Sequence, residues 1–546
     1  MVLSIEVIPM LETARPLRKH APLVLLPLLL GSCSNFVGPI DVGPQDPDGG
    51  DVAEGRTLFR EGTFGTEGYW TRAVRLPQGL LARAFATIDA LDLGLQIDSS
   101  RVEPAVLNAI RTELGTDLSP ANAPTLHDPA VFQRLLAGHA IVGLVADDVD
   151  GNGVVDAAMG DTLGFSCALC HGVVDGSVYD GYDPMMPLTG SIGARVDGPG
   201  AVLLDLGALL AVAENSSALY PYLPLSLTSV GGTPISRTGA SVNVNATEGD
   251  VDALLLDLDD FPVGQVDMLP DGIGAPVTNP SLFDAPSTGP WGVSGEFLDI
   301  EDMMSFHVIV GLDATSIVDT PGAAFLNQMA PGIGSQITNE TATVLATTSV
   351  PVPPGGFPFV DAPFQPVFGD ADRPFGRRID DAALGSLKAY LGSIRYPQGP
   401  PGDPVSVERG ETIYFAQCFD CHGDPLFPTT LPTIPLDLLR VNYLPTNQLT
   451  RGFPYSNMLN DLGTTYDDRV VLFDQIFDDI QVPSLPHEIK ARSLGGLFLR
   501  GRLLHDGSVD SLDALLDPAR GPAASHPFYL SGSARADLIA FLISGL

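Results

Sequence analysis

Cysteine and basic residues are both scarce in this chain. Its 546 residues include five cysteines, and 28 lysines and arginines stand against 66 aspartates and glutamates, which gives a formal net charge of −38. Such a charge repels phosphate backbones and anionic membrane surfaces and favours cationic partners. We therefore expect no nucleic-acid binding, while ordinary solubility is the simplest reason for the acidic composition.

Long apolar runs are missing as well. The apolar stretch at residues 21–30 is too short to span a bilayer, which needs about 20 residues. It follows Arg15, Arg18 and Lys19, an order typical of an export signal. The sequence LGSC that comes next resembles the bacterial lipobox, which implies a mature chain that begins at an acylated Cys33. We expect the periplasmic side of a bacterial membrane or outer membrane, with membrane contact only through the lipid; ordinary cleavage nearby is the alternative.

Four of the five cysteines fall in two short motifs of the form CxxCH, which read CALCH and CFDCH. This pattern is the attachment signature of c-type haem: the cysteines tether the porphyrin and the adjacent histidine ligates the iron. The predicted residues are Cys167, Cys170 and His171 for one haem and Cys418, Cys421 and His422 for the other.

Zinc and disulfide bonds are the rival interpretations of these motifs. A zinc site normally spaces two CxxC pairs by roughly 15–20 residues, whereas about 250 residues separate the pairs here. A disulfide within each pair leaves the two histidines unexplained. Export also suits haem, because c-type haem is attached outside the cytoplasmic membrane. We therefore expect two covalently bound c-type haems as cofactors.

A weak internal repeat predicts two related modules. AEGRTLF at residues 53–59 resembles VERGETIYF at residues 407–415, and each segment precedes a CxxCH and a closing amphipathic helix. The expected fold is mainly α, with two cytochrome c-like haem domains, the first enlarged by loop- and β-containing insertions. The predicted parts are a lipoprotein signal peptide (1–32), an acidic Pro/Gly linker (33–54), an N-terminal haem domain with insertions (55–350), a Pro-rich connection with one helix (351–404) and a C-terminal cytochrome c domain (405–546).

The C-terminal module also carries a family resemblance. VPSLPHEIKARSLGGLFLRGR is followed by LLHDGSVDSLDALLDPA. Together with the two CxxCH motifs, this passage resembles the bacterial di-haem cytochrome c peroxidase superfamily, which includes hydrogen-peroxide reductases, a tryptophylquinone-forming enzyme and haem rubber oxygenases. The resemblance covers residues 51–75, 160–206 and 370–546. It implies the N-terminal haem as the reactive site and the C-terminal haem as an electron store.

The sequence departs from the peroxidases at the sixth ligand of the C-terminal haem. Those enzymes carry a methionine downstream of their His-x-Gly motif, whereas Ala519 lies near that position here and no methionine follows Met458. The resemblance then implies His505 as the distal ligand opposite His422, similar to the rubber oxygenases. His/His ligation gives a lower potential than Met/His ligation. A structural role for His505 is the alternative.

No residue stands out by its spacing as the sixth ligand of the N-terminal haem. In the families that the chain resembles, this iron is commonly open or has a displaceable ligand, so the lack of an obvious ligand is compatible with catalysis there. MMSFH at residues 303–307 is the richest local source, and an ordinary apolar element is its alternative. Trp291, between the motifs, is either an electron stepping stone or a packed aromatic. The full set of candidate ligands is His127, His139, Met159, Met185, Met186, Met303, Met304 and His307.

DVDGNGVVD at residues 148–156 matches the first nine positions of a calcium loop. The twelfth position is Met159 instead of glutamate, so closure of the site depends on Asp161. A solvated acidic turn is the alternative. The predicted calcium ligands are Asp148, Asp150, Asn152 and Asp156.

Two functions follow from these observations. The first is an exported electron-transfer oxidoreductase of the di-haem peroxidase or oxygenase type, which acts on a small-molecule oxidant or substrate. The second is a non-enzymatic di-haem electron carrier in which both irons are six-coordinate. In either case the acidic surface suits a basic cytochrome or copper protein as redox partner.

Overall fold

The computed structural model describes most of the chain from residue 50 onwards. All of the described residues belong to the unit Pro44–Leu546. The predicted signal peptide, Cys33 and His505 lie outside them. The described ranges are 50–224, 240–267, 276–289, 291, 299–319, 322–323, 333–363, 377–423, 433–435, 488–490, 493–504, 507, 509–520 and 530–544.

Helices dominate the described residues, so the expectation of a mainly α fold is confirmed. Two π-helical turns accompany the α-helices, η1 (Tyr69–Ala73) and η7 (His307–Gly311). The α-helices are α1 (Val52–Glu61), α2 (Leu76–Ala82), α3 (Thr87–Asp92), α4 (Pro104–Glu113), α5 (Pro129–Ala137), α6 (Ala168–His171), α7 (Leu206–Leu210), α8 (Glu248–Leu255), α9 (Ile300–Phe306), α11 (Ile333–Thr347), α12 (Asp381–Leu391), α13 (Pro404–Gln417), α14 (Phe419–His422), α19 (Leu512–Leu515) and α20 (Gly532–Ser544).

The strands are short and pair only in twos within the described ranges. β1 with β5 is parallel, whereas β2 with β3, β4 with β6, β7 with β8 and β9 with β10 are antiparallel. Their bounds are β1 (Ile97–Asp98), β2 (Leu144–Asp147), β3 (Thr162–Phe165), β4 (Gly172–Val174), β5 (Ile192–Gly193), β6 (Arg195–Asp197), β7 (Gln265–Val266), β8 (Val277–Thr278), β9 (Thr433–Pro435) and β10 (Glu488–Lys490).

Aspartates start the helices that matter most for the site. Asp51 caps α1 with its carboxylate, which accepts hydrogen bonds from the backbone of Ala53 and Glu54. Asp380 caps α12 in the same way, and Asp403 caps α13 directly before a proline at the first helical position. These residue types satisfy the free N–H groups of a helix start. Part of the negative charge is thus used for helix capping.

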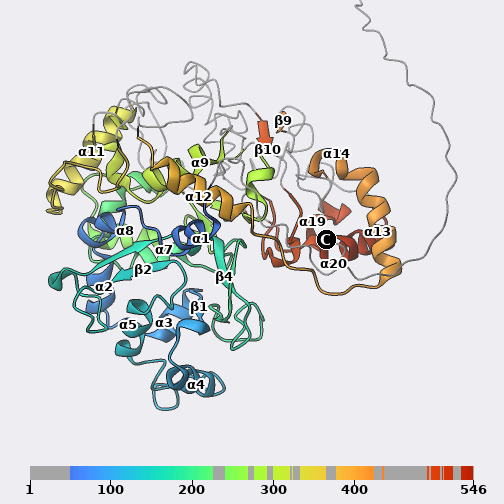
Figure 1. Ribbon diagram of the computed structural model, residues 1–546, viewed down its shortest axis with the longest axis horizontal. Coiled ribbons are helices and arrows are strands. Elements are labelled where there is room, and N and C mark those ends of the chain that lie inside the picture. The colour runs from blue at the N-terminus through green and yellow to red at the C-terminus, as the bar shows by residue number, and fades with distance from the viewer. Residues whose placement is uncertain are drawn as a thin grey trace, which may run out of the picture. The chain divides into compact units, whose positions relative to one another are not determined.

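Helices α1 and α12 cross in close contact (Figure 1). A methyl group on Gly55 of α1 would lie 1.8 Å from the Ser386 carbonyl oxygen of α12, so the backbones approach too closely for any side chain. One turn further on, the rings of Phe59 and Tyr390 lie 5.5 Å apart. The glycine therefore fixes the crossing point and the aromatic pair fills the space beside it.

The same arrangement recurs between α13 and α20. A methyl group on Gly410 would lie 2.0 Å from the Asp537 carbonyl oxygen, and the rings of Tyr414 and Phe541 lie 5.3 Å apart. In both crossings the glycine and its aromatic are four residues apart, as are the facing residue and its aromatic. The repeat seen in the sequence is thus present in the structure as two equivalent helix crossings.

Buried apolar side chains of the described residues form three clusters. The largest surrounds η1, α2, α3 and α5. The second brings together α1, α12, α9 and the segment that carries the first CxxCH. The third lies around α13 and α20. Among the described residues, no helix combines the length and the apolar character needed to cross a membrane.

The glycine at the α1 and α12 crossing should be irreplaceable. Gly55→Ala forces the two backbones apart, so we expect a loss of about 1–3 kcal/mol in the free energy of unfolding, measured by chemical denaturation. Gly385→Ala, inside α12, is the matched control. It meets no atom within 4 Å and should stabilise by about 0.5–1 kcal/mol, since glycine weakens a helix interior. Equal stability of the two variants would contradict the crossing.

Candidate haem attachment site

The first CxxCH motif forms a single helical turn between two strands. Cys167 precedes α6, which ends at His171, and β3 and β4 lie directly on either side. The hydroxyl of Ser166, just before the turn, donates to the Arg60 carbonyl of α1 at 2.8 Å. A methyl group on Gly143 would lie 2.1 Å from the Leu169 nitrogen, so the chain packs tightly behind the turn. The turn is therefore fixed by the flanking strands, by the bond from Ser166 to α1 and by close packing against Gly143.

Both cysteines of this turn are free thiols. Burial raises the pKa of Cys167 to about 11, and burial together with the neighbouring Cys167 raises the pKa of Cys170 to about 12. The thiols are therefore neutral at neutral pH. Residues three apart lie on the same side of a helical turn. The turn thus presents two thiols and a histidine together, the set of groups that attaches a c-type haem.

The His171 ring has a fixed tautomer. Its Nδ1 lies 2.9 Å from the Pro280 carbonyl oxygen, which only accepts, so Nδ1 carries the proton and Nε2 keeps a lone pair. Burial lowers the pKa of His171 to about 4; the bond to Pro280 opposes this shift and the nearby His307 adds to it. A neutral imidazole whose other nitrogen donates to a carbonyl is the usual form of a metal-ligating histidine.

These observations fit a c-type haem. The turn supplies two thiols for the porphyrin, an imidazole nitrogen for the iron and an oriented second hydrogen bond. Cys167 also belongs to the apolar cluster formed by α1, α9 and α12. The sequence analysis missed Pro280, because its contribution is a backbone carbonyl, which every residue has.

Helix α9 brings the MMSFH segment towards this turn. Met303 and Met304 are partly buried and pack in the same apolar cluster as Cys167. His307 begins η7, its Nδ1 donates to the Met303 carbonyl at 2.7 Å, and it lies close enough to lower the pKa of His171. Of the candidate sixth ligands, these three are the ones that the structure associates with the first motif.

The other candidates are placed differently. Met159 is 59% exposed and Met185 is 89% exposed, and Met186 is also exposed. His127 and His139 each have Nε2 within hydrogen-bond distance of a backbone carbonyl. None of these three methionines packs in the apolar cluster that contains Cys167.

Trp291 packs in the cluster that contains Cys167, and its Nε1 donates to the Ala285 carbonyl at 2.7 Å. Its environment is thus that of a packed aromatic near the first motif. A role between the two haems stays a prediction.

The second CxxCH follows α13 directly. Cys418 is buried and directly precedes α14, which ends at His422, and the hydroxyl of Tyr414 donates to the Gly423 carbonyl at 2.8 Å. The same tyrosine packs on Phe541 in the helix crossing, so one side chain connects the crossing to the end of the motif. The side chain of Cys421 and the predicted ligand His505 lie outside the described residues.

The predicted calcium loop is folded around its own backbone. Asp148 accepts hydrogen bonds from the backbone of Gly151 and Gly153, and the bond from Gly153 is the main cause of its lowered pKa. Asp161, which is buried, accepts from Val149 and Asp156 at 2.9 Å each. Within the described ranges, no three His, Cys, Asp or Glu side chains are grouped so as to hold a metal ion. Calcium binding stays a prediction.

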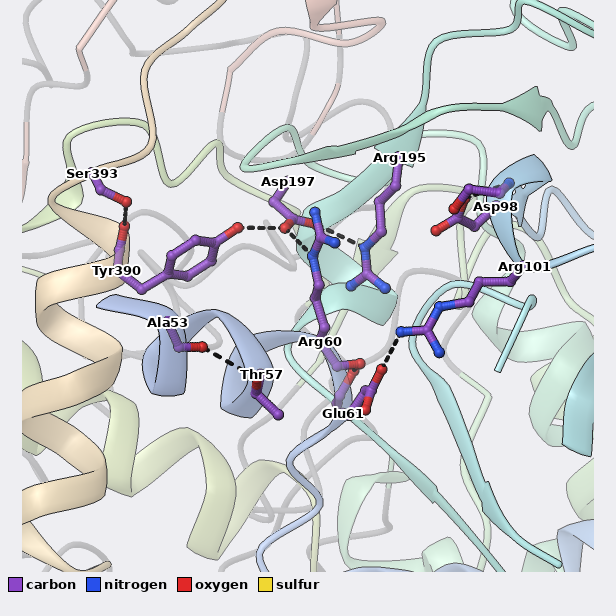
Figure 2. Close-up of polar contacts among 12 residues, drawn as sticks. Ala53, Thr57, Arg60, Glu61, Asp98, Arg101, Arg195, Asp197, Tyr390 and Ser393 are labelled. Carbon is purple, nitrogen blue, oxygen red and sulfur yellow. Dashed lines mark hydrogen bonds and ion pairs between the residues drawn. The ribbon is translucent and has the colours of Figure 1, made fainter. Parts of the chain in front are cut away.

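A buried charge network, which the sequence analysis missed, is centred on Asp197 of β6, the strand that pairs with β4 directly after the first motif. Figure 2 shows its side chains. The Asp197 carboxylate accepts from Arg60 Nε at 2.6 Å, from Arg195 Nε at 2.8 Å and from the Tyr390 hydroxyl. Burial opposes ionisation of Asp197, but Arg195, Tyr390 and Arg60 together lower its pKa. The sequence signal for part of this network was the spacing of Arg195 and Asp197. Alternate residues of a strand point to the same side, so a strand there would bring the two side chains together.

Comparisons with known proteins give little similarity. No family model and no curated protein matches the chain. Among solved structures, hydrazine synthase from Kuenenia stuttgartiensis, pressurized with xenon, aligns with a TM-score of 0.26 and 13% sequence identity. The alignment covers 60% of this chain and 85% of that one. A TM-score of this size carries no argument about fold or function.

The lowered pKa of His171 predicts acid sensitivity of the haem-free protein. Between the ordinary value of 6.5 and about 4, the unfolded chain binds more protons at this residue than the folded chain. The contribution of His171 to stability is therefore complete above pH 6.5 and is lost as pH falls through this window, by up to about 3 kcal/mol. His171→Gln should flatten this part of the pH profile, measured by urea unfolding between pH 4 and 7. Parallel profiles for the two proteins would contradict the assignment.

Proposed function

We propose that this chain is an exported di-haem c-type cytochrome that acts as a haem oxidoreductase of the di-haem peroxidase or oxygenase type. The observation that carries the proposal is the state of His171. His171 directly follows the two cysteines in one helical turn, and both cysteines are neutral thiols. The hydrogen bond from its Nδ1 to Pro280 leaves Nε2 as the nitrogen that would bind iron. A zinc site normally spaces two CxxC pairs by roughly 15–20 residues, whereas about 250 residues separate the pairs here.

The proposal assigns the haem contacts to this chain's own residues. Cys167 and Cys170 tether the first porphyrin and His171 ligates its iron, and the second motif does the same through Cys418, Cys421 and His422. When bound, the haem supplies one-electron chemistry at iron and, where its sixth position is open, a site for a small oxidant. The protein keeps the imidazole neutral, orients it and surrounds the site with apolar side chains.

Two equivalent helix crossings support two cytochrome c-like modules. In each, a glycine and an aromatic of the leading helix meet an aromatic of the closing helix, and a CxxCH lies between the two helices in the chain. Equivalent helix crossings beside two motifs of the same CxxCH form are expected when both motifs hold the same kind of ligand.

The reactive role is assigned to the N-terminal haem. Helix α9 brings Met303, Met304 and His307 towards that site, and η7 begins there. π-helical turns are rare and occur frequently at functional sites. The C-terminal haem serves as the electron store, with His505 as its proposed distal ligand. A basic cytochrome or copper protein is the proposed redox partner, because the chain carries a net charge of −38.

The test is a spectroscopic titration of the exported full chain. We expect two covalent haems per chain by pyridine haemochrome assay, one in the Cys167→Ser/Cys170→Ser variant and one in the matched Cys418→Ser/Cys421→Ser variant. Visible and electron paramagnetic resonance spectra should show one haem that binds cyanide or carbon monoxide, and it should be absent from the first variant only.

Two other outcomes have definite meanings. Two low-spin haems that bind neither ligand would indicate the non-enzymatic electron carrier. Absence of covalent haem from the exported wild-type chain would overturn the proposed function as a whole.

A further inference from the structure

Arg195 has an unusual position for a charged side chain. Only 8% of its side chain is exposed, and its Nε donates to Asp197 at 2.8 Å. Its Nη2 is buried and has no hydrogen-bond partner among the described residues. A buried donor on a charged group that remains unpaired costs at least about 1–3 kcal/mol. Such an atom indicates a missing partner.

The neighbouring groups do not supply this partner. The Asp197 carboxylate already accepts from Arg60, Arg195 and the Tyr390 hydroxyl. Asp98 acts on Arg195 through its charge, but it accepts from the backbone and hydroxyl of Ser100. Figure 2 shows the guanidinium groups of Arg60 and Arg195 directed to the single Asp197 carboxylate.

Arg195 is close to the first CxxCH through the β4 and β6 pair. It pairs with Val174, and β4 begins at Gly172, the residue after His171. Three residues of extended chain span about 10 Å, which sets the scale of the separation between His171 and the Arg195 strand position. The Gly198 backbone also donates to the His171 carbonyl at 2.8 Å. Val174 and Tyr390 belong to the apolar cluster that contains Cys167.

We propose that Arg195 binds a carboxylate of the N-terminal haem through Nη2, while Asp197 holds the guanidinium in place. The inference rests on the proposed function, since haem brings two propionate carboxylates to the site. A guanidinium is planar and always charged, and its fork of donors matches a carboxylate. Asp197 accepts from Nε of Arg195, which leaves Nη2 available to donate to a second carboxylate.

The pairing has a measurable consequence for the haem. A carboxylate beside a guanidinium has a lowered pKa and stays ionised at neutral pH. Its charge then does not change with pH near neutrality, so it adds no pH dependence to the reduction potential of the iron. Loss of the guanidinium should raise the proton affinity of that carboxylate about tenfold or more and couple its protonation to reduction.

The experiment uses the full chain with both haems attached. Arg195→Gln removes the charge and Nη2, and Arg195→Lys keeps the charge without the fork. Arg101→Gln is the matched control, since Arg101 is 46% exposed and pairs with Glu61 at 2.7 Å in the same region. Haem content is measured first, and the potential of the N-terminal haem is then titrated between pH 5 and 8.

We expect two covalent haems in all four proteins. The potential of the N-terminal haem should become more pH-dependent in Arg195→Gln, to a smaller extent in Arg195→Lys, and not at all in Arg101→Gln. If Arg195→Gln keeps both haems and titrates like the wild type, the carboxylate site is wrong and the proposed function is unaffected. If the wild type lacks haem, the proposed function itself fails.

Two further measurements cover the remaining outcomes. If Arg195→Gln loses haem or fails to fold, infrared spectra are recorded of the wild-type protein with haem labelled at the propionate carboxyls. An ionised carboxylate band that is shifted from that of solvated propionate supports the pairing. Bands like those of solvated propionate overturn it. Acetate is also titrated into the haem-loaded wild type and Arg195→Gln. An acetate-dependent potential shift in the wild type alone would mean that a free carboxylate occupies the site, against the haem assignment.

Discussion

The hydrogen bond between His171 and the Pro280 carbonyl is the interaction on which the candidate site depends. It connects residues 109 positions apart and decides which nitrogen of the ring is available. The carbonyl only accepts, so the proton stays on Nδ1, while burial keeps the ring neutral. A ring without this partner would be free to present either nitrogen. The proposed ligation of the first haem iron through Nε2 follows from this one orientation.

Asp197 connects the crossing of α1 and α12 to the first CxxCH turn. Its carboxylate binds α1 through Arg60 and α12 through Tyr390, while its own strand pairs with β4, which follows His171. Ser166 adds a bond from the start of the turn to α1. The position of the turn is therefore tied to both helices. Asp197 binds Nε of Arg195, and Nη2 of that arginine has no hydrogen-bond partner among the described residues.

The two helix crossings are equivalent, but the CxxCH motif associated with each is fixed differently. In the first, roughly a hundred residues separate α1 from the CxxCH, so the turn is fixed by strands and by distant backbone. In the second, the CxxCH follows α13 at once, and Tyr414 both packs in the crossing and binds the end of the motif. The chain between the first motif and α12 also includes α9, which brings Met303 and Met304 to the apolar cluster that contains Cys167.

The sequence by itself determined the mainly α fold and the two closing helices, α12 and α20, and it predicted the haem attachment residues. This was possible because two cysteines and a histidine within five positions are a local pattern, and because apolar periodicity is a property of one segment at a time. The tertiary structure alone decided the roles of Pro280, Asp197 and Arg195 and the approach of α9. A backbone carbonyl has no signature in sequence, and charged residues such as Arg195 are expected at the surface. Burial and pairing across a hundred residues or more arise only when the chain folds.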